Sequence, residues 1–507
     1  MRKGGRRPGA RGRGAWCTIA LAVSCRVWAA GLPEAIPKLI DSSPAARMAF
    51  WGIRIVDLAT GKTLYELNPD HFFVPASNTK LLSTGLALTR LGPDFTFQTR
   101  VLSAGPPDDQ GRLRGNLRLV GGGDPNLSGR AVPYRMGAAT GNPLAAIEDL
   151  AGQLVAHGVK RIEGDVIGDD TWYVWEPYAV GWAIDDPQSD DGPPVSALTL
   201  NDNTVALTVR PGAAAGDPAA LSLKPPVEFY RIENRVRTVP AGGERRIQFN
   251  RIPGSLDAQL WGAIPLLHRG QEMLLGIEDP ALFAAQALRK ALTERGVAVT
   301  GSAVAQHSFP DEFADLTVAP AAPTAPVQPE TELARRVSAP LLEDLRIIAK
   351  ESQNLHAELA LRAVARARRN VGSFEAGQEE LKTFLTEIGV EPGSYNILDG
   401  SGLTRLNLVT PAAVVKLLRY MYDSPMRDAW IWLLPVGGQD GSLSSRFVEH
   451  PGRVHAKTGS LSHVSALSGY VQRANGRWVA FSILVNNFNG HTSEVHAVMD
   501  RICGLLD

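Results

Sequence analysis

The stretch VPASNTKLL, residues 74–82, places a serine and a lysine three positions apart at the start of an apolar segment. The leucines that follow predict a largely buried helix that ends near Gly92. At the start of such a helix, the dipole and the free N–H groups favour negative charge on Ser77. Lys80 projects on the same side one turn later, and a partly desolvated lysine can take the proton of a serine hydroxyl. The two residues are therefore either the reactive pair of an acylating enzyme or a helix-capping serine followed by an incidental lysine.

Two further short motifs lie much later in the chain. SQN, residues 352–354, precedes the helical segment NLHAELALRA, and KTGS, residues 457–460, begins a strand-like segment. Taken singly, SQN is typical of a helix cap and KTGS of a turn with an exposed lysine. In the order Ser-x-x-Lys, Ser-x-Asn and Lys-Thr-Gly, however, the motifs form the signature set of penicillin-binding proteins and class A β-lactamases.

The two ends of the chain share a pattern of two strands followed by a helix. Strands are predicted over 49–57 and 62–66, ahead of the helix that carries Lys80. Two more strands flank a turn at 474–476, ahead of an amphipathic helix over 492–506. The simplest arrangement is one α/β domain made from both ends of the chain, with other domains inserted into it.

The middle of the chain has a different texture. Residues from about 97 to 310 are mostly short β-like runs separated by Gly, Pro and Asp, and a Pro/Ala-rich connector follows over 318–330. Helices are predicted near 142–158, 280–295, 340–370 and 374–388. Because 507 residues are too many for one ordinary core, two or three domains are expected.

Longer segments around the motifs carry a specific resemblance. They are DGSGLTRLNLVTP (399–411), LPVGGQDGSLSSRF (434–447) and AKTGSLSHVSALSGYV (456–471), with GGGDPNL, IEGDVIGDDTWY and GWAIDD in the middle of the chain. Together they resemble the D-alanyl-D-alanine carboxypeptidase/endopeptidase family, which comprises the class C low-molecular-mass penicillin-binding proteins (penicillin-binding protein 4 type, peptidase family S13). The resemblance runs from about residue 35 to 507. The long gap between the first two motifs also favours this family, since simple β-lactamases have a far shorter one.

The resemblance implies a multi-domain α+β fold, in which a penicillin-binding, β-lactamase-like serine transpeptidase domain carries two β-rich inserted domains. The expected boundaries are a signal peptide at 1–29, a catalytic domain at 30–96 plus 325–507, domain II at 97–198 plus 273–324, and domain III at 199–272.

It also implies a mechanism. Ser77 attacks the carbonyl between two D-alanine residues to form an acyl-enzyme, and Lys80 acts as its general base. Ser352 relays a proton to the leaving amine, in contact with both lysines. Asn354 orients the substrate amide, and Lys457 adds positive potential. Water then hydrolyses the acyl-enzyme, and neither a metal nor an organic cofactor is expected.

The remaining KTGS residues are expected to bind substrate. Thr458 helps to hold the terminal carboxylate, and Gly459 allows a close approach to the backbone. The backbone N–H groups of Ser77 and Ser460 form the oxyanion hole. Gln353 replaces the aspartate that the family often has in the middle of its second motif, with little effect expected.

Two charged residues are candidates for substrate specificity. In the family, an aspartate after a Gly-Trp motif and the arginine of the Asp-Gly-Ser-Gly segment recognise the zwitterionic end of a diaminopimelate side chain. Asp186 and Arg405 occupy the matching positions, with Asp185 as a competitor for the first role. The alternative is an ordinary surface salt bridge.

The first residues predict secretion. A basic start, MRKGGRRPGARGRG, precedes the mostly apolar AWCTIALAVSCRVWAA, which is typical of a signal peptide cleaved after Ala29. A membrane anchor or an unprocessed tail is the alternative. Cys17 and Cys25 lie in this segment, so only Cys503 would remain and no internal disulfide could form. We therefore expect a periplasmic protein.

The expected function is a serine-type D-alanyl-D-alanine carboxypeptidase with DD-endopeptidase activity. Its expected partners are peptidoglycan stem peptides and β-lactams, which inhibit it covalently. The formal net charge of zero gives no indication of nucleic-acid binding. A serine β-lactamase or related esterase, and a non-catalytic module that binds penicillin or peptidoglycan, remain alternatives. The oligomeric state stays open.

Overall fold

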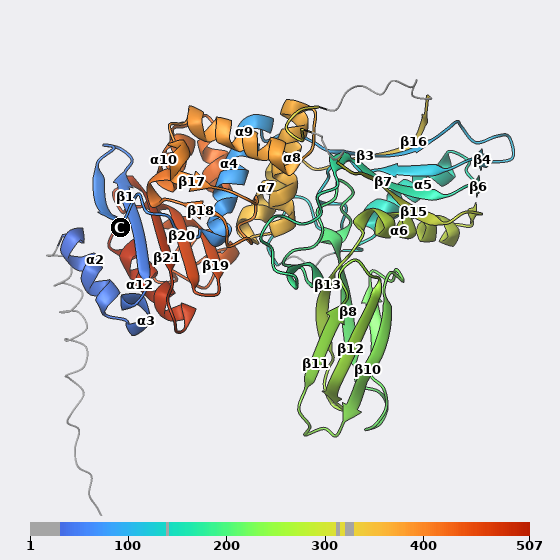
Figure 1. Ribbon diagram of the computed structural model, residues 1–507, viewed down its shortest axis with the longest axis horizontal. Coiled ribbons are helices and arrows are strands. Elements are labelled where there is room, and N and C mark those ends of the chain that lie inside the picture. Colours follow the sequence, from blue (N-terminus) through green and yellow to red (C-terminus); the bar gives the residue numbers. More distant parts are fainter. Residues whose placement is uncertain (1–30, 138–140, 311–314, 320–328) are drawn as a thin grey trace, which may run out of the picture.

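The computed structural model describes residues 31–507, except 138–140, 311–314 and 320–328. The predicted signal peptide lies outside the described residues. The chain forms two bodies side by side, with a β-rich lobe that projects from the second one (Figure 1). Within the described ranges, no helix combines the length and the apolar character that spanning a membrane requires.

The first body is built on a five-stranded antiparallel sheet that joins the two ends of the chain. Its strand order is β19-β20-β21-β1-β2. The bounds are β19 Val454–Leu461, β20 Val464–Gln472, β21 Trp478–Asn486, β1 Phe50–Asp57 and β2 Thr63–Leu67. β1 pairs with β21 along its whole length, from Phe50 opposite Asn486 to Asp57 opposite Val479. The prediction that both chain ends build one α/β domain is confirmed.

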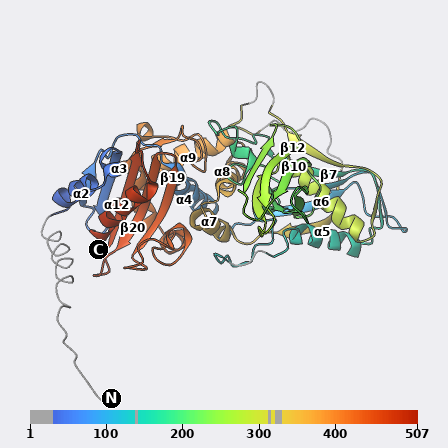
Figure 2. The ribbon, with the colours of Figure 1, turned by 90° about the horizontal axis from the view of Figure 1, so that it is seen from below.

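Helices cover both faces of this sheet (Figures 1 and 2). On one face lie α2 (Leu32–Asp41), α3 (Pro44–Arg47) and α12 (Thr492–Gly504). On the other lie α4 (Thr79–Leu91), α7 (Leu341–Lys350), α8 (Asn354–Arg369), α9 (Phe374–Glu387), α10 (Pro411–Asp423) and α11 (Arg427–Leu433). A short pair, β17 (Tyr395–Asn396) and β18 (Leu408–Val409), also belongs to this body. Because residues of one strand alternate between the faces, Ile55 packs into the first helical layer and Val56 into the second.

The helical segment predicted over 340–370 consists of two helices, and the second begins within SQN, where a helix cap was one interpretation of the sequence. α7 ends at Lys350 and α8 begins at Asn354. Ser352 lies between them with a φ of +64°, in the left-handed region that a helix interior does not allow. The break therefore coincides with the second motif.

The second body contains another five-stranded sheet, β15-β7-β5-β3-β16. Its strands are β15 Ala303–Ser308, β7 Val166–Val174, β5 Leu117–Val120, β3 Gln98–Ser103 and β16 Thr331–Val337. The helices α5 (Ala145–Ala156) and α6 (Pro280–Glu294) pack against it, and a small sheet is formed by β14 (Ala298–Val299), β6 (Arg161–Glu163) and β4 (Arg112–Arg114).

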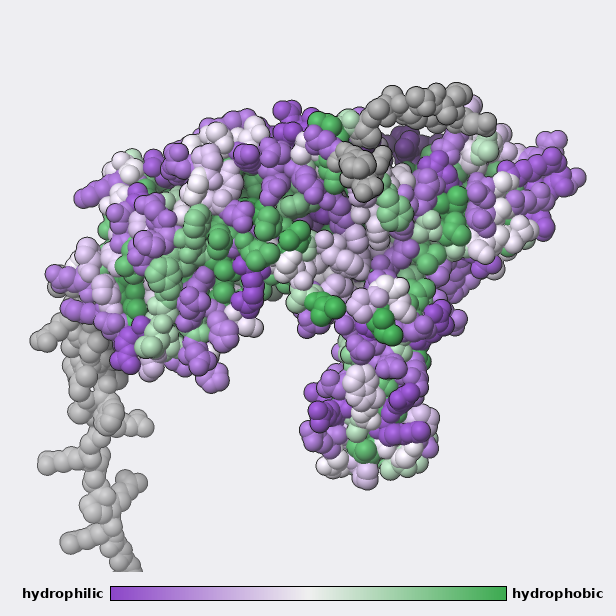
Figure 3. Space-filling view, viewed as in Figure 1, coloured by the Kyte–Doolittle hydropathy of each residue, from purple (hydrophilic) through white to green (hydrophobic). Residues whose placement is uncertain are grey.

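The projecting lobe consists of two three-stranded sheets. One has the order β13-β8-β9, with β13 Gln271–Gly276, β8 Thr204–Arg210 and β9 Ala220–Lys224. The other has the order β10-β12-β11, with β10 Arg231–Val239, β12 Asp257–Pro265 and β11 Arg246–Arg251. The space-filling view shows a hollowed outline between the first body and this mainly hydrophilic lobe (Figure 3).

Strand pairing moves two of the expected domain boundaries. The catalytic domain was expected to resume at residue 325, but β16, Thr331–Val337, pairs with β3 of the second body. The start of domain II's second segment was expected at residue 273, but β13 pairs with β8 of the lobe as far as Gly276. The composition along a sequence does not reveal which strands pair with each other, so these two domain boundaries could be placed only from the tertiary structure.

Candidate active site

Ser77 lies at the junction of the sheet with α4. It belongs to a 3₁₀ turn, Ala76–Asn78, that runs directly into α4. No side chain caps the first turn of α4, and the Ser77 hydroxyl accepts a hydrogen bond from Lys80 Nζ at 3.0 Å instead. The helix-cap interpretation of this serine is therefore wrong, because its oxygen bonds to the lysine.

Lys80 is almost completely buried, with 1% of its surface exposed. Besides Ser77, its Nζ donates to Asn354 Oδ1 at 2.5 Å and to the Ser401 carbonyl at 2.7 Å. Burial lowers the pKa of Lys80 to about 7, although the nearby carboxylates of Asp399 and Glu358 act in the opposite direction. A lysine with such a pKa can act as a base near neutral pH.

Ser352 and Lys457 form the second half of the cluster. The Ser352 hydroxyl accepts a hydrogen bond from Lys457 Nζ at 2.8 Å, and the same ammonium reaches the Thr458 carbonyl at 2.9 Å. Burial and the charge of Lys80 lower the pKa of Lys457 well below its usual range. Among the described residues Lys80 bonds to Asn354 rather than to Ser352, so only part of the expected contact between Ser352 and both lysines is present.

Gly459 lets β19 lie directly against the turn that carries Ser77. A Cβ atom at Gly459 would lie 2.7 Å from the Pro75 carbonyl oxygen and 3.0 Å from the Ser77 nitrogen. The Asn78 side chain also donates to the Lys457 carbonyl at 2.9 Å. The close approach expected at this glycine is thus made by the chain's own backbone.

Thr458 and Ser460 lie on β19 beside this contact. The Thr458 hydroxyl forms a 2.7 Å hydrogen bond with the hydroxyl of Ser442, and Ser460 is exposed. Ser442 belongs to a short 3₁₀ turn, Gly441–Leu443. Ser442 was not among the site residues predicted from the sequence, although it lies within the segment LPVGGQDGSLSSRF that supported the resemblance.

A buried acidic pair holds the loop that faces Lys80. Asp399 accepts hydrogen bonds from the Ser401 hydroxyl and from the Gly402 and Thr404 N–H groups. Glu358 accepts from the N–H groups of Gly400 at 2.7 Å and Ser401 at 2.9 Å. Burial, with the Asp399 charge, raises the pKa of Glu358 to about 7. Both carboxyl groups fix the Ser401 carbonyl that receives Lys80, and neither was identified from the sequence.

The second body contributes a loop to the site. The Trp182 indole donates to Asp399 at 3.1 Å, and the Asn354 side chain donates to the Asp191 carbonyl at 2.7 Å. Both contacts join residues that are far apart in the sequence. Asn354 is therefore held between Lys80 and the second body.

The two specificity candidates do not contact each other. Asp186 is half-buried and accepts a hydrogen bond from the Ala183 N–H at 2.7 Å, and burial raises its pKa. Arg405 is exposed and donates to the Ser462 carbonyl at 2.9 Å. Within the described ranges no ion pair involves either residue or Asp185, so a surface salt bridge does not explain them.

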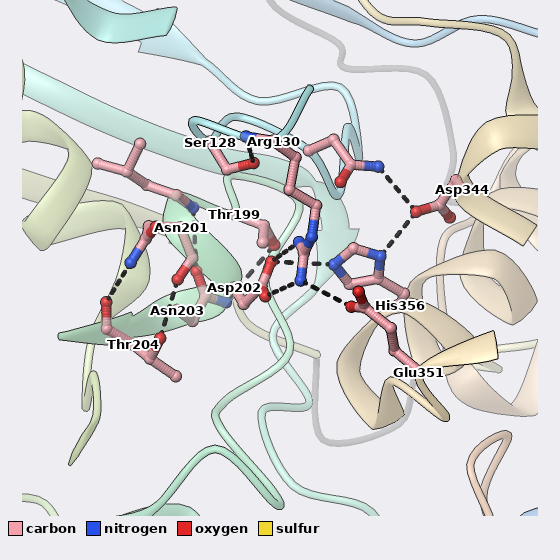
Figure 4. A network of polar contacts seen from close by, with 12 residues as sticks. Ser128, Arg130, Thr199, Asn201, Asp202, Asn203, Thr204, Asp344, Glu351 and His356 are labelled. Atoms are coloured by element: carbon pink, nitrogen blue, oxygen red, sulfur yellow. Dashed lines mark hydrogen bonds and ion pairs between the residues drawn. The ribbon is translucent and has the colours of Figure 1, made fainter. Parts of the chain in front are cut away.

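A charged network joins the second motif to the second body (Figure 4). His356 is fully buried, two residues after Asn354, and its ring contacts Asp344 at 2.7 Å and Asp202 at 3.1 Å. Burial lowers the pKa of His356, but the two carboxylates outweigh this effect and raise it to about 9. Arg130 from the second body pairs with Asp202 at 2.5 Å. A charged histidine thus links α8 to the inserted part of the chain.

The described side chains do not indicate a metal site: no group of three or more His, Cys, Asp or Glu residues among them is arranged to hold an ion. Cys503 is buried, and the other two cysteines lie outside the described residues.

Comparisons with known proteins agree with this arrangement. Residues 32–507 match the family described as D-Ala-D-Ala carboxypeptidase 3 (S13). A D-alanyl-D-alanine carboxypeptidase from Actinomadura sp. (strain R39) is 32% identical over 472 residues, which are 90% of this chain and 81% of that protein. The D-alanyl-D-alanine carboxypeptidase DacB of Haemophilus influenzae is 25% identical over 431 residues, 84% of this chain and 82% of that one.

A solved structure shows the same fold. The crystal structure of penicillin binding protein 4 (dacB) from Haemophilus influenzae superposes with a TM-score of 0.77 at 23% identity. The match covers 93% of this chain and 98% of the other chain. The inserted bodies are therefore part of the shared fold.

Proposed function

The chain belongs to the S13 family of D-Ala-D-Ala carboxypeptidases, and we propose that Ser77 is its nucleophile, the residue that becomes acylated by the substrate. The protein is a serine-type D-Ala-D-Ala carboxypeptidase. The observation that supports Ser77 most strongly is its 3.0 Å hydrogen bond from Lys80, whose burial lowers its pKa to about 7. A weak nucleophile and a base adjusted to neutral pH are in contact before any substrate arrives.

In the proposed acylation step, neutral Lys80 takes the Ser77 proton as the serine oxygen attacks the carbonyl between two D-alanines. The N–H groups of Ser77 and Ser460 stabilise the negative charge that develops on the carbonyl oxygen. Ser352, bonded to Lys457, relays the proton: its hydroxyl protonates the leaving nitrogen and is reprotonated by the Lys80 ammonium, which becomes neutral again. The C–N bond breaks, the amine leaves, and an ester to Ser77 remains.

Water completes the cycle. It attacks the ester carbonyl while Lys80 takes its proton, and as the acyl C–O bond breaks Lys80 returns that proton to the Ser77 oxygen, so the serine is regenerated and the acid product leaves. The hydrogen bond from Lys80 to Asn354 keeps the lysine near both steps. Asn354 also lies where it can orient the substrate amide, since its nitrogen faces the Asp191 carbonyl at the border of the second body.

We further propose peptidoglycan stem peptides as the substrates. Lys457 and Thr458 hold the terminal carboxylate, Gly459 keeps β19 close to Ser77, and Asp186 and Arg405 recognise the zwitterionic end of a diaminopimelate side chain. The opposite charges of Asp186 and Arg405 suit such a group, and neither residue is neutralised by the other.

β-Lactams are proposed to acylate the same serine and to leave slowly. The Haemophilus influenzae penicillin binding protein 4 structure with a bound β-lactam has the same fold, with a TM-score of 0.72 at 23% identity. Residues 1–29 are proposed to direct the chain to the periplasm, where cross-linked peptidoglycan is available for DD-endopeptidase cleavage. We keep the proposed division into three domains, with the boundaries expected at residues 273 and 325 moved to agree with the strand pairing.

Labelling with a fluorescent penicillin tests the nucleophile. We expect one label per chain, no label in Ser77→Ala, and normal labelling in Ser493→Ala, an exposed serine on α12 that serves as the control. Persistent labelling of Ser77→Ala would remove the assignment.

Digestion of a pentapeptide muropeptide tests the reaction. The wild-type protein should release D-alanine, and Ser77→Ala should not. Rapid turnover of penicillin would instead indicate a β-lactamase, whereas acylation without any release of D-alanine would indicate a non-catalytic binding module.

A further inference from the structure

A cleft next to the catalytic cluster has no role in the mechanism above. It has a volume of about 590 Å³, and both bodies contribute to its walls. The second body supplies Tyr134, Arg135 and Met136, and the first body supplies Arg346, Lys350, Trp432, Gln439 and Asp440. Clefts of about 300–1,000 Å³ hold ligands much larger than one amino acid.

Two residues of the cleft wall are close in the chain to groups that handle the leaving group in the proposed mechanism. Lys350 is the last residue of α7, two positions before Ser352. Asp440 precedes the turn of Ser442, whose hydroxyl bonds to Thr458 at 2.7 Å. In the proposed function, Ser352 protonates the leaving amine and Thr458 holds the carboxylate of the leaving residue. A leaving group longer than one residue would therefore extend into this cleft.

The walls of the cleft are cationic and aromatic. The Arg346 guanidinium lies 3.9 Å from the centre of the Trp432 ring and 5.5 Å from that of Tyr134. Trp432 is 41% exposed and Met136 is 48% exposed, so apolar side chains face the solvent here. Such rings fix the direction of an arginine and leave its outer edge available to a carboxylate.

The positive charges of the cleft are only partly compensated. Lys350 is paired with Asp440 at 2.7 Å. Within the described ranges, neither Arg135 nor Arg346 has a carboxylate at ion-pair distance, and the Nε atom of Arg346 is buried without a hydrogen-bond partner. The cleft therefore favours a ligand that carries free carboxylates.

We propose that this cleft binds the leaving strand of a peptidoglycan cross-link, with the strand's carboxylates at Arg346 and Arg135 and its apolar part on Trp432. This inference rests on the proposed function and makes the same site a DD-endopeptidase. A single leaving D-alanine, whose carboxylate is held by Lys457 and Thr458, is too short to fill the cleft as well, so the cleft should affect cross-linked substrates only.

Cleavage of a cross-link follows the same steps as release of D-alanine, with a longer leaving group. The amide C–N bond between the D-alanine carbonyl and the amine of the leaving strand breaks as the ester to Ser77 forms. The proton from Ser352 goes to that amine, and the strand leaves through the cleft. One water molecule then hydrolyses the ester.

Two substrates separate the cleft from the catalytic cluster. We would compare kcat/KM for a cross-linked muropeptide dimer with that for an uncross-linked pentapeptide monomer. Arg346→Met keeps much of the side-chain length and removes the charge, and Arg135→Ala removes the second, exposed cation. Each variant should lose about tenfold on the dimer, the effect of one charge-assisted hydrogen bond, and less than twofold on the monomer. Arg419→Met, an exposed arginine on α10, is the matched control and should change neither.

Each other outcome is decisive. Equal losses on both substrates, or unchanged cleavage of the dimer by both variants, would overturn the cleft proposal. A wild-type protein that releases D-alanine from the monomer but leaves the dimer intact would overturn it too, and the proposed function would stand. A protein that cleaves neither substrate would instead refute the proposed function. The rate of penicillin acylation should match that of the wild type in both variants, which verifies that they are folded.

Discussion

The contact between Gly459 and the Ser77 turn leads to a sharp prediction for Gly459→Ala. The new methyl group would lie 2.7 Å from the Pro75 carbonyl oxygen and 3.0 Å from the nitrogens of Ser77 and Asn78. All three are backbone atoms, so none can rotate away. Ordinary contact begins at 3.4 Å, so β19 and the turn must separate by about 0.7 Å.

That separation displaces Ser77 from Lys457 and from the rest of β19. A misplacement of about 1 Å can lower a catalysed rate by about 10²-fold, so we expect acylation to slow by about 10- to 100-fold. The overpacking itself should lower the free energy of unfolding by about 1–3 kcal/mol. The second-order rate constant for a fluorescent penicillin, followed by stopped flow, measures the first effect, and urea unfolding measures the second.

Gly393→Ala is the matched control. Nothing lies within 4 Å of a Cβ atom at that position, and it belongs to the same body of the protein. Its acylation rate and its unfolding midpoint should stay near those of the wild type. If Gly459→Ala acylates within about threefold of the wild-type rate, the reasoning from this contact is refuted.

Two further predictions concern the titrating groups. Because Lys80 has a pKa of about 7 and must be deprotonated to act as a base, the acylation rate should rise with pH through 7 and be about a tenth of its plateau at pH 6. Glu358→Gln should move this midpoint to lower pH, since the Glu358 charge raises the pKa of Lys80. A profile that is flat from pH 6 to 8 would contradict the role of Lys80. For His356, whose pKa is raised to about 9, the stabilisation is fully present below the unfolded value of about 6.5 and is lost as the pH rises through 9. His356→Gln should therefore cost about 3 kcal/mol in urea unfolding at pH 6, and a cost that stays constant up to pH 10 would show that the histidine charge does not matter.

Much of the fold was predictable because its patterns are local. The strands around 474–476 and the leucine-rich helix after Lys80 are both present in the structure, and most of their residues are buried, on both faces of the strands and all round the first turns of the helix. The residues of the three motifs and their order along the chain also identified the family, which the comparisons confirm. The helical pattern over 340–370 continues across Ser352. The helix-cap interpretation of SQN placed a helix start there, where α8 begins, but nothing in the sequence indicated that Ser352 has a positive φ.

The sequence by itself determined which chemistry the chain carries: a serine, two lysines and an asparagine in a recognisable order, on segments whose periodicity fixes helix or strand. Only the tertiary structure decided how those groups act. The burial that lowers the pKa of Lys80 is made by segments distant in the chain. The carboxylates of Glu358 and Asp399, which raise that pKa, lie close to Lys80 because they hold the loop whose Ser401 carbonyl accepts its hydrogen bond. The cleft at Arg346 likewise exists only where the two bodies meet. Desolvation and contact depend on what surrounds an atom in space, and spacing along the chain does not specify those neighbours.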